Sequence, residues 1–215
     1  MVFCDIERRL KNRREYWEAA AFELKLLANL IRIGYKVERN YPSGKGRHNC
    51  DLKASNESET VFIEIKRPRE LIAQNRKIIN KAQSFFNSKL LTDSIKSDDD
   101  FTLSPLLSRA EADKVFSIVR NAVNKQIPDR GPGIIIVEAP HALDSREFAM
   151  IAEERFRGRK KYPSLSAVVL IKSNFHDSQI YHNSHIVFNP LANVDIKQLA
   201  ITDFLHKLNE PNGIA

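Results

Sequence analysis

The feature that most constrains the fold is the stretch at residues 49–68, which reads NCDLKASNESETVFIEIKRP. Residues 50–54 alternate between apolar and polar side chains, and residues 55–59 are polar. Residues 61–66 are apolar and β-branched until an acid and a lysine appear, which is typical of a strand with a charged end. Pro68 has no N–H to donate to a strand ladder. The stretch therefore predicts a β-hairpin whose second strand ends just before Pro68.

Side-chain alternation gathers charges at one end of this hairpin. Glu64 and Lys66 fall on the same side of the second strand, because successive side chains of a strand point to opposite faces. Asp51, on the first strand, can bring a second carboxylate to that end, while its neighbour Cys50 should point into the core. The other face carries the β-branched residues Val61, Ile63 and Ile65.

Two carboxylates and a lysine suit the hydrolysis of phosphodiester bonds. Mg²⁺ prefers hard oxygen ligands and typically takes one or two carboxylates together with water and phosphate, and Asp51 and Glu64 could supply those carboxylates. The metal would polarise the phosphate and acidify a bound water. Lys66 would hold that water or neutralise the charge that develops on phosphorus. We therefore expect Mg²⁺ as the cofactor, with Mn²⁺ as a possible substitute.

This arrangement of Asp51 followed by Glu64-Ile65-Lys66 resembles the PD-(D/E)XK superfamily of restriction-endonuclease-like nucleases. The order of elements over residues 17–172 is similar as well, although Cys50 stands where the name of the motif has a proline. The resemblance implies a restriction-endonuclease-like core and metal-dependent cleavage of nucleic acid, with DNA as the expected substrate. It also implies an acid on the first helix that points at the metal, and Glu23 matches that position.

The spacing of an acid and a lysine has a simpler interpretation, because it occurs four times in this chain. An ion pair on a solvated strand would explain Glu64 and Lys66 without any catalysis. The chain could then be a nucleic-acid-binding module that does not cleave, or a structural or partner-binding protein. The four matches are Glu23–Lys25, Asp51–Lys53, Glu64–Lys66 and Asp195–Lys197.

Glu23 lies in a helix expected at residues 5–33, with Gly34 as its stop. At 100° per residue, Glu23 falls in the middle of the apolar stripe of this helix, where a carboxylate is costly to bury unless it is paired or binds a metal. A metal ligand, a salt bridge to a buried arginine and a position at the rim of the core all remain open for Glu23. The stripe consists of Ala19, Leu26, Leu27 and Leu30.

The net charge of +7 and the pI near 9.4 are compatible with a polyanionic partner. Two segments carry concentrated positive charge, the loop at residues 41–48 and the stretch at residues 155–162, and either could contact phosphates or form an ordinary solvated surface. The residues expected to contact nucleic acid are Lys45, Arg47, Arg67, Arg155, Arg157, Arg159, Lys160 and Lys161.

The whole pattern predicts an α/β fold in a single domain over residues 1–215, with a central mixed β-sheet flanked by α-helices on both faces. A basic N-terminal helix and a closing C-terminal helix flank the core at residues 17–172. A polar loop is expected to hold His176, His182 and His185 as surface residues. The remaining elements are expected as strands at 35–40, 134–138, 167–171 and 185–189, helices at 70–91, 109–126, 144–157 and 195–208, and a loop at 92–105.

Cellular location follows from composition. The two cysteines favour a reducing compartment, and the N-terminus has no long apolar stretch typical of a signal peptide. No apolar run is long enough to span a membrane. We therefore expect a cytoplasmic protein with nucleic acid, and not a membrane, as its partner.

Overall fold

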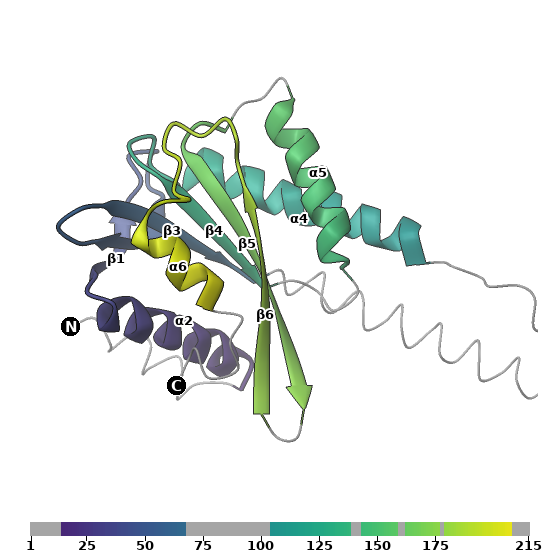
Figure 1. The fold of residues 1–215 in the computed structure, drawn as a ribbon, viewed down its shortest axis with the longest axis horizontal. Helices are drawn as coiled ribbons and strands as arrows, with labels where there is room; N and C mark the ends of the chain where they lie inside the picture. The colour runs from purple at the N-terminus through teal and green to yellow at the C-terminus, as the bar shows by residue number, and fades with distance from the viewer. Residues whose placement is uncertain (1–13, 68–103, 139–142, 159–161, 177–178, 208–215) are drawn as a thin grey trace, which may run out of the picture.

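The computed structural model describes residues 14–67, 104–138, 143–158, 162–176 and 179–207 (Figure 1). Within these residues the chain has an α/β fold with a six-stranded mixed open sheet and four helices. The helices are α2 (Arg14–Arg32), α4 (Ser104–Lys125), α5 (Ser145–Arg157) and α6 (Ala200–Lys207). The strands are β1 (Lys36–Pro42), β2 (Asn49–Ser55), β3 (Thr60–Lys66), β4 (Gly133–Glu138), β5 (Leu165–His176) and β6 (Gln179–Phe188).

The strands lie in the sheet in the same order as in the chain. β1 pairs antiparallel with β2, and β2 pairs antiparallel with β3. β3, β4 and β5 pair in parallel, and β6 returns antiparallel to β5. α4 and α5 lie in the two connections between parallel strands, as such strands require long crossovers. The mixed sheet and the hairpin of β2 and β3 confirm the predictions from sequence.

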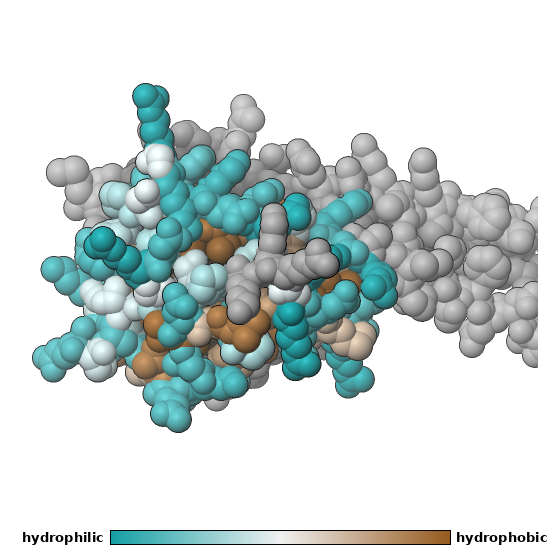
Figure 2. All heavy atoms as spheres, turned by 90° about the horizontal axis from the view of Figure 1, so that it is seen from above, coloured by the Kyte–Doolittle hydropathy of each residue, from teal (hydrophilic) through white to brown (hydrophobic). Residues whose placement is uncertain are grey.

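Helices pack on both faces of the sheet, as predicted, and each face has its own apolar core. α2 and α6 contribute Leu27, Leu30 and Phe204 to one core, and α4 and α5 contribute Phe116 and Phe148 to the other. The central strand β4 is buried on both sides, which explains its unbroken apolar sequence. The outer surface is largely hydrophilic with small apolar patches on the face seen in Figure 2. Among the described residues, no helix has the length and apolarity needed to cross a membrane.

The side chains of β1 and β2 switch from one face of the sheet to the other at the same point of their ladder. Leu52 belongs to the core under α2, whereas Cys50, two residues earlier, belongs to the core under α4. In β1, Tyr41 likewise packs under α4, and it pairs with Cys50 in the ladder. Between these positions lies Asn40, whose φ of 52° is uncommon for a residue other than glycine. The irregularity interrupts the alternation at Asp51 and therefore sets the direction of its side chain.

The strands predicted at 167–171 and 185–189 are present but longer than predicted, and the polar loop predicted between them was wrong. His176 ends β5, and His182 and His185 lie in β6, so these histidines are not in a polar loop. The ladder of β5 and β6 runs without interruption from the pair Ala167–Phe188 to the pair His176–Gln179. Polar residues misled the prediction because an antiparallel pair of strands can expose a face to water.

Helix boundaries also differ from the predictions. α4 begins at Ser104, five residues before its predicted start, and α6 begins at Ala200, five residues after its predicted start. Asp195 instead accepts a hydrogen bond from the N–H of Lys197 in the turn that precedes α6. The predicted helix at 70–91, most of the predicted loop at 92–105 and the first part of the N-terminal helix lie outside the described residues.

Candidate active site

The candidate site lies where the ladder between β2 and β3 ends. Backbone pairing of the two strands runs from Ser55–Thr60 to Leu52–Ile63. Beyond that point, side chains serve the backbone groups: Asp51 Oδ2 accepts a hydrogen bond from the N–H of Ile65 at 2.8 Å, and Glu64 Oε2 accepts one from the N–H of Asp51 at 3.0 Å. These two hydrogen bonds cross between the strands and draw the two carboxyl groups together.

The thiol of Cys50 also bonds to a backbone group where the ladder of β2 and β3 ends. Its Sγ donates to the carbonyl oxygen of Ile63 at 3.2 Å, at the last pair of the ladder. Cys50 is fully buried, as predicted, and burial raises the pKa of its thiol to about 12. The thiol is therefore protonated at neutral pH and acts as a hydrogen-bond donor rather than as a thiolate ligand for a metal.

Lys66 neutralises part of the charge of the site. Its Nζ lies 2.5 Å from Glu64 Oε1, and the side chain of Glu64 is 0% exposed while that of Lys66 is 23% exposed. A fully buried carboxylate is costly unless it is paired, so this pair differs from an ion pair on a solvated strand. Lys66 also keeps one side open to water, from which a substrate could approach.

The electrostatics of the site favour an additional cation. The pKa of Glu64 is raised to about 7, first by burial and then by the negative charge of Asp51, and Lys66 opposes both effects only in part. Burial also raises the pKa of Asp51, against the opposing hydrogen bond from the N–H of Ile65. Two carboxyl groups that disfavour each other's ionisation form a site whose charge a bound cation would balance.

The donor set fits Mg²⁺ or Mn²⁺. Asp51 and Glu64 offer hard carboxylate oxygens, which these ions prefer, and the protonated Cys50 offers no competing thiolate. Within the part of the chain that the structure describes, no three His, Cys, Asp or Glu side chains gather around a single metal position. Two carboxylates are sufficient for Mg²⁺, since this ion usually keeps several waters and binds substrate phosphate as well.

Glu23 lies close to this site and has an arginine partner. Its Oε1 is 2.5 Å from Arg39 Nη2, and both side chains are largely buried, with 13% and 10% exposed. The charge of Glu23 nevertheless raises the pKa of Asp51. The burial of Leu26 and Leu30 confirms the helical phase predicted from sequence. The structure therefore shows the salt bridge to a buried arginine that the sequence left open, and the metal role of Glu23 stays a prediction.

Arg39 is the residue near the site that the sequence reasoning missed. It shares the α2 side of β1 with Val37, two residues before it, and faces Leu52 across the ladder. The period-two pattern of β1 could have placed Arg39 on that side of the sheet. Its partner Glu23 could not be found by spacing, because the two residues come from different elements.

The other three pairs of acid and lysine do not form such an arrangement. Lys53 makes an ion pair with Glu38 of β1 at 2.8 Å on the surface. Asp195 supports the turn before α6, as described above, and Lys25 is exposed on α2. The buried contact between acid and lysine therefore distinguishes Glu64 and Lys66 from the remaining matches.

Several residues expected to contact nucleic acid have partners within the protein. Lys45 Nζ lies 2.8 Å from the carbonyl oxygen of Val123 and 2.8 Å from Asp129, and thereby attaches its loop to the end of α4. Arg67 Nε lies 2.5 Å from Glu138 Oε2 at the ends of β3 and β4. These partners are distant in sequence, so local patterns could not predict them, and the role of Lys45 and Arg67 toward nucleic acid stays a prediction.

The remaining basic residues vary in their surroundings. Arg47 is exposed in the loop before β2. Arg155 pairs with Asp113 of α4 at 3.0 Å, and Arg157 lies 3.9 Å from Glu153 one turn earlier in α5. The three other basic residues of this stretch lie outside the described residues: Arg159, Lys160 and Lys161.

Comparison with known protein families and with curated proteins finds no match to this chain. Evidence about function therefore comes from the geometry of the site.

Proposed function

We propose that this chain is a metal-dependent nuclease that hydrolyses phosphodiester bonds of nucleic acid, with DNA as the expected substrate. The observation that carries this proposal is the convergence of the Asp51 and Glu64 carboxyl groups beside Lys66, where the ladder of the hairpin ends. Two acids that share a buried site with a lysine are more than the fold requires, because a ladder of backbone hydrogen bonds would be less costly there.

The arrangement of the strands supports a restriction-endonuclease-like core. A helix precedes three antiparallel strands, and the third of these pairs in parallel with β4 after a connection that contains α4. Asp51 and Glu64-Ile65-Lys66 occupy the hairpin in the positions that the resemblance to the PD-(D/E)XK superfamily implies. This agreement in order supports the assignment of the core to that type.

Asp51 and Glu64 would hold the metal, and the backbone N–H groups that bind their second oxygens would fix their orientation. When bound, Mg²⁺ supplies a Lewis acid that polarises the phosphate and lowers the pKa of a bound water. Lys66 would leave Glu64 Oε1 for the substrate, where its ammonium would offset the charge that develops on the phosphate. Glu23 would add negative charge next to Asp51, and Arg39 would limit that charge.

A structural role is the second candidate, because Glu64 and Glu23 both have basic partners within the protein. In that case the acids would stabilise the sheet and take no part in chemistry. A thermal shift with divalent metal separates the two candidates. A nuclease site should be stabilised by Mg²⁺, whereas a set of internal ion pairs should not respond to it.

Cleavage of plasmid and of single-stranded DNA and RNA, in Mg²⁺, Mn²⁺ or chelator, tests the proposal directly. We expect cleavage that requires the metal and that Asp51→Asn abolishes. Asp195→Asn is a matched control, since Asp195 precedes a lysine at the same spacing but lies in an exposed turn. Cleavage that survives in chelator, or an equal loss in both variants, would contradict the assignment.

A further inference from the structure

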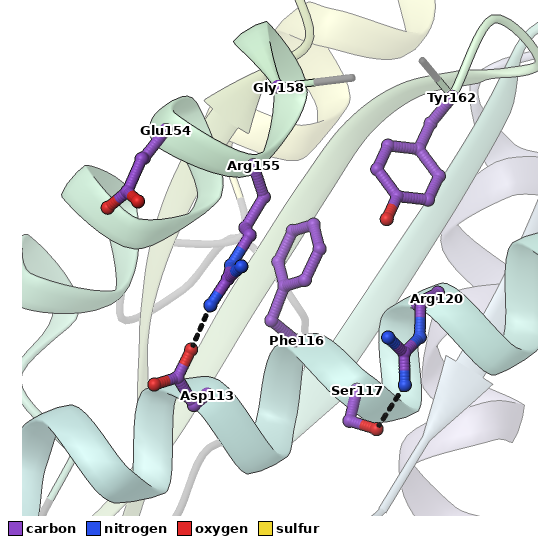
Figure 3. Close-up of a pocket in the computed structure, with 8 residues that line it drawn as sticks. All are labelled: Asp113, Phe116, Ser117, Arg120, Glu154, Arg155, Gly158 and Tyr162. Atoms are coloured by element: carbon purple, nitrogen blue, oxygen red, sulfur yellow. Dashed lines mark hydrogen bonds and ion pairs between the residues drawn. The ribbon is translucent and has the colours of Figure 1, made fainter. Parts of the chain in front are cut away.

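A groove of about 480 Å³ lies between α4 and α5, on the side of the sheet opposite α2 (Figure 3). Its floor is a rigid aromatic cluster in which Phe116, Phe156 and Tyr162 pack edge to face, with ring centroids 5.8 to 6.3 Å apart. The volume is in the range of ordinary ligand sites. None of these residues belongs to the proposed active site, so the groove needs its own explanation.

The hydroxyl of Tyr162 points to a ligand. The side chain is buried, with 7% of the residue exposed, and Figure 3 shows its hydroxyl directed into the groove. No hydrogen bond of this hydroxyl to another described residue is found, and its oxygen is not among the buried polar atoms, so it is accessible from the groove. A tyrosine with a buried ring and an accessible hydroxyl can hydrogen-bond to an oxygen-bearing ligand in the groove.

The charge of the groove selects an anion. Arg155 is neutralised by Asp113 across the groove at 3.0 Å, and Figure 3 shows Glu154 directed away from the aromatic floor. Arg120 has no carboxylate partner in the described part of the chain, and its nearest contact is a long hydrogen bond of 3.3 Å to Ser117. One guanidinium and two hydroxyl groups therefore face the same space, and all three can donate to the oxygens of a phosphate.

We propose that this groove binds a backbone phosphate of the nucleic-acid substrate through Arg120, Ser117 and Tyr162. The proposal rests on the proposed nuclease function and adds a second contact to it. Tyr162 lies just before β5, and the next residues of its segment hydrogen-bond to Gly133 at the start of β4. Lys66 pairs with Val137, four residues further along β4, which corresponds to roughly 13 Å along the sheet. This figure covers only the direction along the strands, so a duplex that contacts both places must be longer than about four base pairs, at one phosphate every 3.4 Å on each strand.

Binding of a fluorescent duplex of about 20 base pairs, measured by anisotropy in chelator between about 50 and 200 mM salt, tests the proposal. Arg120→Gln should reduce the slope of log affinity against log salt by about 0.9, the value for one phosphate contact. Tyr162→Phe keeps the aromatic floor and removes only the hydroxyl, so it should weaken binding about tenfold and leave the slope unchanged. Lys114→Gln is the control, since it removes one positive charge from an exposed residue of the same helix that does not line the groove, and it should alter neither quantity.

The outcomes separate this proposal from the proposed function. If the wild-type protein cleaves DNA but Arg120→Gln keeps the full slope and Tyr162→Phe keeps the full affinity, the groove assignment is overturned and the nuclease assignment stands. If the wild-type protein neither cleaves nor binds DNA, both are overturned. If inorganic phosphate stabilises the wild-type protein but not Arg120→Gln, while both bind duplex equally, the groove holds a free anion and the nucleic-acid contact is overturned. Tyr162→Phe retains the whole packed ring, so weaker binding by this variant would not be explained by misfolding.

Discussion

Glu64→Gln should stabilise the metal-free protein at alkaline pH, although it removes a buried ion pair. Glu64 is fully buried, and its pKa is raised to about 7 even with Lys66 in contact. The unfolded chain releases this proton near the ordinary pKa of a glutamate, whereas the folded chain keeps it until about pH 7. Ionised Glu64 therefore opposes folding, and its penalty grows as the pH rises between these two values.

The size of the effect follows from the two pKa values. A rise from 4.5 to about 7 corresponds to roughly 3 kcal/mol of stability that is lost between acidic and alkaline pH. Glutamine carries no charge, so Glu64→Gln should remove this loss. Lys66 is partly exposed and can turn toward water once its acidic partner is replaced.

Urea unfolding in chelator, at a series of pH values from about 5 to about 8, measures the effect. The free energy of unfolding of the variant should be closest to that of the wild-type protein at the acidic end of the range. Toward the alkaline end the variant should become increasingly more stable than the wild-type protein. Glu38→Gln is the matched control on the same sheet, because a hydrogen bond from Lys53 lowers the pKa of this exposed acid, so its effect on stability should not change over this pH range. A difference between Glu64→Gln and wild type that does not change with pH would refute the reasoning.

Two further predictions concern the acids of the site. Mg²⁺ or Mn²⁺ should raise the thermal midpoint of the wild-type protein at about pH 8, above the raised pKa of Glu64, and should have little effect on Asp51→Asn; equal shifts in calorimetry would remove Asp51 from the metal site. Glu23→Gln should cost roughly 1 to 3 kcal/mol in urea unfolding, because it leaves the largely buried Arg39 without its acid, and Arg39→Gln in addition should restore part of the loss. A double variant whose losses simply add would show that this pair is not coupled.

The hairpin was predictable because its signals are local. The turn, the β-branched run and Pro68 all lie within about twenty residues, and the resulting strands end within a residue or two of their predicted limits. Cys50 and Ile63 are buried, as alternation predicted, and α2 has the predicted phase at Leu26 and Leu30.

The contacts of the site depend on tertiary structure and were beyond local pattern. Alternation alone would place Cys50 and Leu52 on the same face, but they lie in different cores, beside the irregular backbone of Asn40 on the neighbouring strand. The crossed hydrogen bonds of Asp51 and Glu64 depend on where the ladder stops, which side-chain composition does not encode. Partners from distant elements, such as Arg39 for Glu23, require the assembled sheet.

The rate of Mg²⁺-dependent plasmid cleavage in Lys66→Ala, compared with Lys53→Ala, tests the central claim most directly. Both lysines follow an acid at the same spacing and make an ion pair with a glutamate, but only one of these two pairs has a buried acid beside Asp51. We predict that Lys66→Ala retains its fold and its affinity for DNA but loses at least about a hundredfold in cleavage rate, whereas Lys53→Ala cleaves like the wild-type protein. Cleavage by Lys66→Ala at the wild-type rate would show that Lys66 is only an ion-pair partner and would contradict the proposed active site.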